Sequence, residues 1–508
     1  MSRIARNTSA VATAFVVTTL LSFVQIKLLT RYLTQDALGE YSAAFAIGAL
    51  VSVLAQVGLP VVVLRFTAKY DALGAPERIR RLFQFAFSVT ALLSVVILVL
   101  VHFTAPAILP RFYQHPPAAV GVGLATGLWL ATALRQVVYS VFDGRRRMRI
   151  PAVLENLNLA ALTIALLALR TRLDVPLVLG LSLVSGLATL ACGLVLLFRR
   201  GVCPAGDQLP PVQRAELIRD IQPFWRGAAV NSLIGIGFGY ADKLLVSLFL
   251  SFQMVSLFYV AERVTFLLKR LLAVPLQVTA PEMTHRWEGG RREELLRDVG
   301  FMLKVQFALG WLVTAMVFVA AEAAVLLLSS PAFLPAAGLL RILTLSVMLM
   351  AFYAPITTLF RAIERIDLAL LSDVLWLGLY VALGIALMPR YALKGIVLAQ
   401  VTASAVTALW NVIAARRSAR IAWDVPGMVR VALSGLLATI PGYLVARALG
   451  RAGYPYFGLG IALLVGLVFL LLVVRTGAIS AADRTRLRTL AGRRPAAKSE
   501  AVGEAPAV

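Results

Sequence analysis

The chain has 508 residues, of which 60% are hydrophobic and 15% charged, and its net charge is +24. A soluble protein carries roughly 45–50% apolar and about 25% charged residues, so the composition excludes that class and indicates a polytopic membrane protein. The basic excess does not point to nucleic acid, because cytoplasmic loops of membrane proteins collect Lys and Arg and no separate soluble domain is present to hold a nucleic-acid module.

Apolar runs long enough to cross a bilayer, about 17–25 residues each, follow one another along the chain. The first is too long for a signal-peptide core and lacks a clear cleavage site, so we expect a retained helix. We predict fourteen spans, at about residues 9–30, 41–64, 82–109, 119–142, 151–169, 175–198, 227–249, 254–281, 300–328, 336–360, 369–388, 395–414, 431–446 and 455–474.

The distribution of basic residues between the spans predicts the orientation. An even number of spans places both termini on one side of the membrane. If that side is cytoplasmic, the inner segments carry 33 Lys and Arg and the outer loops carry 8. The positive-inside rule therefore predicts a multi-pass protein with both termini in the cytoplasm.

Several polar residues recur along the chain at a spacing of about 216. The matched positions are Lys27 and Lys243, Gly74 and Gly290, Glu77 and Glu293, Arg81 and Arg297, Phe142 and Phe360, and Arg199 and Arg416. Matched Lys, Glu and Arg at one spacing indicate an internal duplication. Repeats of whole helix bundles are typical of secondary transporters, in which two lobes move around a central site.

The expected fold class is therefore an all-α polytopic membrane protein of about fourteen helices, built as two six-helix lobes with the same orientation plus two C-terminal helices. The predicted domains are an N-lobe at 1–198, a cytoplasmic linker at 199–226, a C-lobe at 227–414, helices thirteen and fourteen at 415–475 and a basic cytoplasmic tail at 476–508. Apolar positions in the linker, Val212, Leu217 and Ile221, predict a short interfacial helix.

The eighth span is the strongest candidate for a functional helix. It carries Glu262, Arg263, Lys269 and Arg270 among apolar residues. An ionisable group at membrane depth costs at least a few kcal/mol, so it usually faces a cavity or a partner. A spacing of seven places the two pairs on one helix face. Snorkelling of Lys269 and Arg270, or internal pairing of Glu262, is the alternative to a cavity-lining role.

Other ionisable residues lie at repeat-related positions. Lys27 and Lys243 are each near the outer end of a span, where snorkelling is an equal alternative, and Asp242 next to Lys243 offers a self-neutralising pair. Arg135 in the fourth span and Arg341 in the tenth are candidates for lobe interiors.

The sequence contains no catalytic constellation. It has no P-loop and no paired acidic motif of the kind that holds a metal and a sugar nucleotide, and its three histidines lack metal-ligand spacing. We therefore expect no enzyme activity, no metal and no cofactor.

Five short stretches carry a family resemblance. They are 28–33 (LLTRYL), 38–41 (LGEY), 56–60 (QVGLP), 64–65 (LR) and 333–343 around AA and LRIL. With the span arrangement, they make the chain similar to the Wzx-type oligosaccharide and polysaccharide flippases of the multidrug/oligosaccharidyl-lipid/polysaccharide (MOP) exporter superfamily.

The resemblance implies a V-shaped transporter of the bacterial inner membrane with a cationic cavity between its lobes. Its substrate would be a polyprenyl-pyrophosphate-linked oligosaccharide, turned from the inner to the outer leaflet by alternating access. The expected partners are this substrate and membrane lipids, with a polysaccharide polymerase and glycosyltransferases as further candidates and no nucleic acid. The expected cationic residues of the cavity are Arg263, Lys269, Arg270 and Lys27. Supporting or ion-coupling candidates are Glu262, Asp242, Lys243, Arg65, Arg135 and Arg341.

Alternatives remain open at this point. A lipid II flippase of the same superfamily is one, although the first span lacks the dense arginine pattern expected there. Drug efflux would favour an acidic or aromatic cavity. A membrane-embedded polymerase or ligase usually needs a large outer loop, whereas every outer loop here is short. A non-transporting scaffold need not enclose a basic vestibule.

Overall fold

The computed structural model of the chain describes residues 3–113, 115–199, 214–419, 421 and 423–478. Within these ranges every regular element is a helix. The predicted tail beyond residue 478 and residues 200–213 of the predicted linker lie outside the described residues. The expected all-α class is confirmed for the part of the chain that is described.

The helices follow the predicted spans closely. In chain order they are α1 (Arg3–Tyr32), α2 (Gln35–Gln56), α3 (Leu59–Ala72), α4 (Pro76–Phe112), α5 (Ala119–Gly144), α6 (Arg149–Ala168), η1 (Arg170–Arg172), α7 (Val175–Arg199), α8 (Arg214–Phe249), α9 (Phe252–Glu288), α10 (Arg292–Leu328), η2 (Pro331–Phe333), α11 (Ala336–Ala362), α12 (Ile366–Tyr391), α13 (Leu393–Ser418), α14 (Val425–Arg451) and α15 (Phe457–Arg475). Each predicted span falls on one helix, except that the second is divided between α2 and α3. Among the described residues, eleven helices are long and apolar enough to cross a membrane.

The sequence repeat is accompanied by a repeat of local geometry. Both bounds of α10 lie 216 residues after those of α4. The turns before these helices use a left-handed glycine at the matched positions, Gly74 (φ 64°) and Gly290 (φ 76°). A second matched pair of turns has a left-handed residue at Arg146 (φ 57°) and at Glu364 (φ 60°). The matched positions therefore fold in the same way.

The second predicted span is broken where α2 meets α3. Val57 and Gly58 both adopt left-handed backbone conformations there. The Trp225 indole on α8 donates a hydrogen bond of 2.8 Å to the Val57 carbonyl oxygen. A Cβ atom on Gly58 would lie 2.5 Å from the backbone of Ala228, so only glycine admits α8 this close. The break is thus a docking point for α8.

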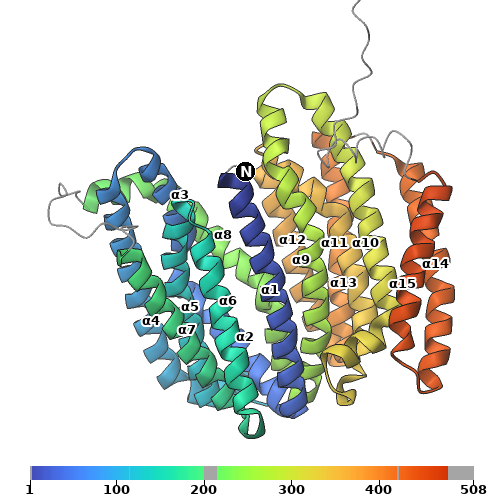
Figure 1. Ribbon diagram of the computed structural model, residues 1–508, viewed down its shortest axis with the longest axis horizontal. Coiled ribbons are helices and arrows are strands. Elements are labelled where there is room, and N and C mark those ends of the chain that lie inside the picture. The colour runs from blue at the N-terminus through green and yellow to red at the C-terminus, as the bar shows by residue number, and fades with distance from the viewer. Residues whose placement is uncertain (1–2, 114, 200–213, 420, 422, 479–508) are drawn as a thin grey trace, which may run out of the picture. The chain divides into compact units, whose positions relative to one another are not determined.

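The chain divides into two compact units. Unit 1 comprises residues 1–265, 324–343 and 373–403, and unit 2 comprises 266–323, 344–372 and 404–508. In unit 1, α5 packs beside α4 and α7 (Figure 1). In unit 2, α14 packs beside α15 (Figure 1). This division by compactness does not test the predicted lobes, which remain a prediction.

Each unit has its own apolar core. In unit 1 a large cluster joins α3, α4, α5, α7 and the start of α8, with Tyr70 and Phe142 among its fully buried side chains. In unit 2 one cluster surrounds Phe360 on α11, and another joins α10 to α14 and α15 around Phe469.

The start of α8 differs from the expected interfacial helix. A helix does form there, but Leu217 and Ile221 are buried in the core of unit 1. Asp220 accepts a 2.7 Å bond from Lys69 Nζ and another of 2.7 Å from the Tyr70 hydroxyl. Apolar residues four apart fit a bilayer surface or a protein groove equally well, and the groove of α3 and α4 provides charges complementary to this helix.

Candidate functional site

A cavity of about 610 Å³ lies within unit 1. Its lining comes from α1, α2, α5, α6, α7 and the first part of α9. The charged residues in this lining are Arg135, Glu155 and Arg263. Its aromatic residues are Tyr41, Phe45, Trp129, Tyr139 and Tyr259. The cavity therefore combines a positive excess with a large aromatic surface.

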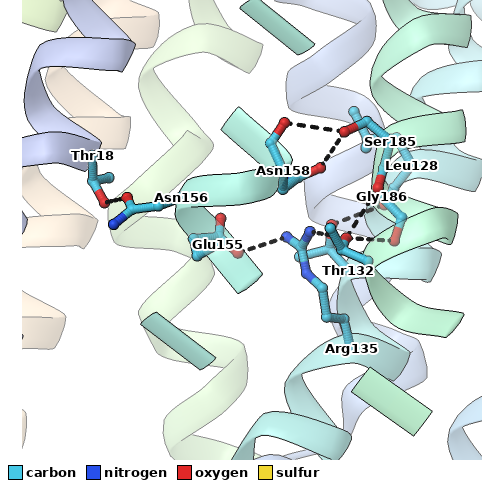
Figure 2. Close-up of polar contacts among 10 residues, drawn as sticks. Thr18, Leu128, Thr132, Arg135, Glu155, Asn156, Asn158, Ser185 and Gly186 are labelled. Atoms are coloured by element: carbon cyan, nitrogen blue, oxygen red, sulfur yellow. Dashed lines mark hydrogen bonds and ion pairs between the residues drawn. The ribbon is translucent and has the colours of Figure 1, made fainter. Parts of the chain in front are cut away.

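Polar bonds attach α1 to α6 along the cavity. The Thr18 hydroxyl donates to Asn156 Oδ1 at 2.7 Å (Figure 2). Seven residues further along α1, Gln25 Nε2 donates to the Leu159 carbonyl at 3.0 Å and to Thr163 Oγ1 at 3.1 Å. Such bonds between membrane helices contribute about 1 kcal/mol each. They fix the wall of the cavity that α1 supplies.

Arg135 on α5 is the centre of a polar network (Figure 2). Its side chain is buried, and its guanidinium lies 3.3 Å from Glu155 Oε2 on α6. It also donates to Thr189 Oγ1 on α7 at 3.2 Å. The Asn158 carboxamide, oriented to satisfy both neighbours, accepts from Arg135 at 3.0 Å and donates to Ser185 at 2.6 Å. The network thus joins three helices around one neutralised arginine.

Arg263 on α9 is the second cation of the cavity. Its guanidinium carbon lies 5.1 Å from the centroid of the Tyr259 ring. Its buried Nε has no hydrogen-bond partner among the described residues. A cation over an aromatic face is stabilised without losing its charge. Arg263 is therefore held in place with a donor still to be satisfied.

A compact set of charges joins α8 to the residue that precedes Arg263 on α9. Lys243 on α8 is buried, with its Nζ 3.2 Å from Glu262 Oε2 and 3.6 Å from Asp242 Oδ1. The same Nζ lies 5.6 Å from the Tyr240 ring centroid. The two acids and Lys243 give a net charge of −1, which Arg263 brings to zero. The structure thus brings together four of the residues selected from the sequence.

The remaining predicted residues lie elsewhere. Lys27 Nζ donates to the carbonyl oxygens of Leu326 and Ser329, at 2.8 Å each, and so caps the end of α10. The Arg65 guanidinium on α3 lies 4.2 Å from the Phe224 ring centroid. Their expected roles at a substrate site remain predictions.

Three other arginine and lysine positions lie on α9 and α11. Lys269 is half-buried and Arg270 exposed, and both belong to the part of α9 in unit 2. Arg341 is half-buried on α11 in unit 1. Their contribution to a cationic cavity also remains a prediction.

The aromatic part of the cavity was not selected from the sequence. Trp129 and Tyr139 lie on α5, as does Arg135, and Tyr139 is one helical turn beyond Arg135. Aromatic residues in an apolar span carry no signal that distinguishes a cavity lining from packing. Only their unsatisfied polar atoms in the folded chain mark them.

The sequence pattern of a protein family described as "Polysaccharide biosynthesis protein" matches residues 4–287, more than half of the chain. The chain belongs to this family. The matched region includes α1 to α9 and therefore all the lining residues of the unit 1 cavity.

One curated protein is similar to part of the chain. Stage V sporulation protein B of Bacillus subtilis (strain 168) is 23% identical over 171 residues, which are 34% of this chain and 33% of the relative. The chain thus matches about a third of that relative's length.

Two solved structures share the fold at low identity. The lipid II flippase MurJ in an inward closed conformation matches with a TM-score of 0.74 and 13% identity, covering 92% of this chain and 98% of its own. An inward-facing multidrug resistance MATE family transporter of the MOP superfamily has a TM-score of 0.62 and 16% identity, covering 79% and 96%. The chain is a multi-pass membrane protein that shares the fold of these two transporters.

Proposed function

We propose that the protein flips polyprenyl-pyrophosphate-linked oligosaccharide units from the inner to the outer leaflet of the bacterial inner membrane, by alternating access. The membership of the polysaccharide biosynthesis family and the shared fold with membrane transporters support this proposal. In this function the protein moves its substrate and catalyses no covalent change. Glycosyltransferases would assemble the substrate before this step, and a polysaccharide polymerase would act after it.

The observation that carries the proposal is the position of Arg263 in the lining of the cavity. A pyrophosphate that leaves water needs a fixed positive partner in a medium of low dielectric constant. At about 4 Å and an effective dielectric constant of about 20, two unit charges attract by about 4 kcal/mol. Arg263 supplies this charge in a cavity of suitable size, with an Nε donor that has no partner among the described residues.

The charges near Arg263 partly compensate one another. Lys243 lies within 3.6 Å of both Asp242 and Glu262, so it offsets one of these two negative charges and Arg263 offsets the other. Protonation of one of these acids would raise the positive charge around Arg263 and strengthen its hold on an anion. Asp242 and Glu262 are therefore our candidates for coupling transport to an ion or to the membrane potential.

Replacement of Arg263 tests the function. Cells that depend on this chain should lose surface polysaccharide and accumulate lipid-linked intermediates when Arg263→Glu is expressed at the wild-type level. Arg263→Lys, which keeps the charge but not the fork of donors, should retain partial export. Arg111→Gln, at an exposed position near the end of α4, is the matched control.

Normal export by Arg263→Glu would refute the role of this residue. The chemistry of the intermediate that accumulates identifies the substrate. An oligosaccharide on a polyprenyl pyrophosphate supports the proposal, and accumulation of lipid II alone would replace it with peptidoglycan precursor transport.

A further inference from the structure

We propose that the aromatic surface of the unit 1 cavity is a saccharide subsite, which binds uncharged sugar residues adjacent to the pyrophosphate. The proposal rests on the proposed function, because it places the pyrophosphate at Arg263. It goes further in naming the part of the substrate that Trp129 and Tyr139 recognise, and its chemical class.

The first support is the rigidity of Trp129. Its ring centroid lies 5.0 Å from that of Phe45 at an interplanar angle of 66°, and 5.4 Å from that of Tyr240 at 80°. Edge-to-face contacts of this kind fix the indole between rings from α2 and α8. A fixed, electron-rich aromatic surface suits the C–H face of a pyranose ring, whose hydrogens carry partial positive charge.

The second support is a set of unsatisfied donors. Trp129 Nε1, the Tyr139 hydroxyl and Arg263 Nε are all buried, and none has a hydrogen-bond partner in the described part of the chain. More than nine in ten buried polar groups in folded proteins are paired. Three unpaired donors belong to side chains that line one cavity, and they become available to a ligand rich in acceptors, such as sugar hydroxyl and amide oxygens, when these side chains turn toward it.

The third support is the charge of the lining. Arg135 and Glu155 form a pair at 3.3 Å, so they contribute polarity without net charge. The excess positive charge of the described lining therefore belongs to Arg263. The pair therefore adds no net attraction for a second anionic group, whereas a neutral saccharide can bond to both of its members. The lining therefore favours an anionic group of the ligand at Arg263 and a neutral polar group at Arg135 and Glu155.

The size of the cavity agrees with a short saccharide. A volume of about 610 Å³ lies within the range of roughly 300–1,000 Å³ that small-molecule sites occupy. The subsite therefore fits the sugars nearest to the lipid and not a whole polymer.

Binding to three defined lipids tests the subsite. The full chain in nanodiscs is titrated with undecaprenyl pyrophosphate, with the same lipid carrying a neutral N-acetylhexosamine disaccharide, and with peptide-bearing lipid II. Tyr139→Phe removes one hydroxyl and Trp129→Phe removes the indole donor, and both keep an aromatic ring. Tyr454→Phe, at an exposed position between α14 and α15, is the matched control.

We expect Trp129→Phe and Tyr139→Phe each to weaken binding of the disaccharide lipid by roughly five- to tenfold and to leave the sugar-free lipid unchanged. Arg263→Gln should weaken both. If the two aromatic variants affect both lipids equally, or neither, the saccharide subsite is wrong although the flippase proposal stands. If Arg263→Gln affects neither lipid, the proposed function fails. Tighter binding of lipid II than of the disaccharide lipid, sensitive to Trp129→Phe, would overturn the neutral-saccharide assignment.

Discussion

At the scale of single residues, buried charges in this chain are placed in sets that balance. Lys243 is buried beside Glu262 and Asp242, where Arg263 completes the balance, and the buried Arg135 pairs with Glu155. A buried pair need not add net stability, because desolvation offsets much of the attraction. Removal of one partner is different, since it leaves an uncompensated charge in a low-dielectric environment.

Lys243 is the residue at which this asymmetry is sharpest. We expect Lys243→Met to destabilise the protein by about 3–5 kcal/mol, because Glu262 and Asp242 lose their cation. The measurement is thermal unfolding of the purified protein in detergent. Lys243→Met combined with Glu262→Gln should recover part of the loss, because one of the two acids is then neutral. An unchanged melting temperature for Lys243→Met alone would show that the ion pairs do not stabilise the fold.

At the scale of elements, the start of α8 is bound to α3 and α4 by side chains outside the predicted spans. Asp220 bonds to Lys69 and Tyr70, and Glu216 pairs with Arg78 at 2.7 Å. Burial alone would raise the pKa of Asp220, but the hydrogen bonds from Lys69 and Tyr70 outweigh it and lower the pKa. Burial and the bond to Asp220 raise the pKa of the Tyr70 hydroxyl.

The lowered pKa of Asp220 gives a pH dependence with a definite sign. A carboxyl group whose pKa is lower in the folded state stabilises that state above its unfolded pKa of about 3.9, and the stabilisation is lost as the pH falls through the folded pKa. The protection factors of Arg214–Trp225, which correct hydrogen exchange for its intrinsic pH dependence, should therefore be high at neutral pH and fall below about pH 4. Asp220→Asn should accelerate exchange at neutral pH and make it less dependent on acid. Equal exchange in the variant and the wild type would show that apolar burial alone holds this segment.

Some elements of the fold could be predicted from the local sequence, and others depend on residues far away along the chain. Continuous apolar runs of bilayer length gave the spans, because no other local pattern produces them. The break at Val57 and Gly58 was not predicted, since it interrupts an apolar run and depends on the approach of α8. The partners of Lys27 were not predicted either, because Leu326 and Ser329 are about 300 residues away along the chain.

The residues of the candidate site likewise include some that could be predicted from the sequence and some that could not. Charge in an apolar span pointed to Arg263, Glu262 and Lys243, because ionisable groups are rare there. The aromatic surface around Trp129 could not be predicted, since its distinguishing property is a lack of partners in the folded state.

At the scale of the whole molecule, the distribution of basic residues and the internal repeat predict the same orientation of the chain across the membrane. The turns at Gly74 and Gly290, and those at Arg146 and Glu364, have the same backbone geometry at matched positions. If each repeat contains six spans, matched turns lie on the same side of the membrane. The basic excess of 33 Lys and Arg against 8 predicts that these turns are cytoplasmic.

Reporter insertions test this orientation. We expect alkaline phosphatase, which needs an oxidising compartment, to be active when inserted at η1 (Arg170–Arg172) and inactive at the Arg146 and Glu364 turns. A fluorescent protein fused after Thr476 should fluoresce, because that position is predicted to be cytoplasmic. Opposite activities at Arg146 and Glu364 would contradict the parallel repeat, since an inverted repeat would place the two turns on different sides. Activity at both turns with none at η1 would instead preserve the repeat and reverse the whole molecule, which the charge distribution argues against at a ratio of about four to one.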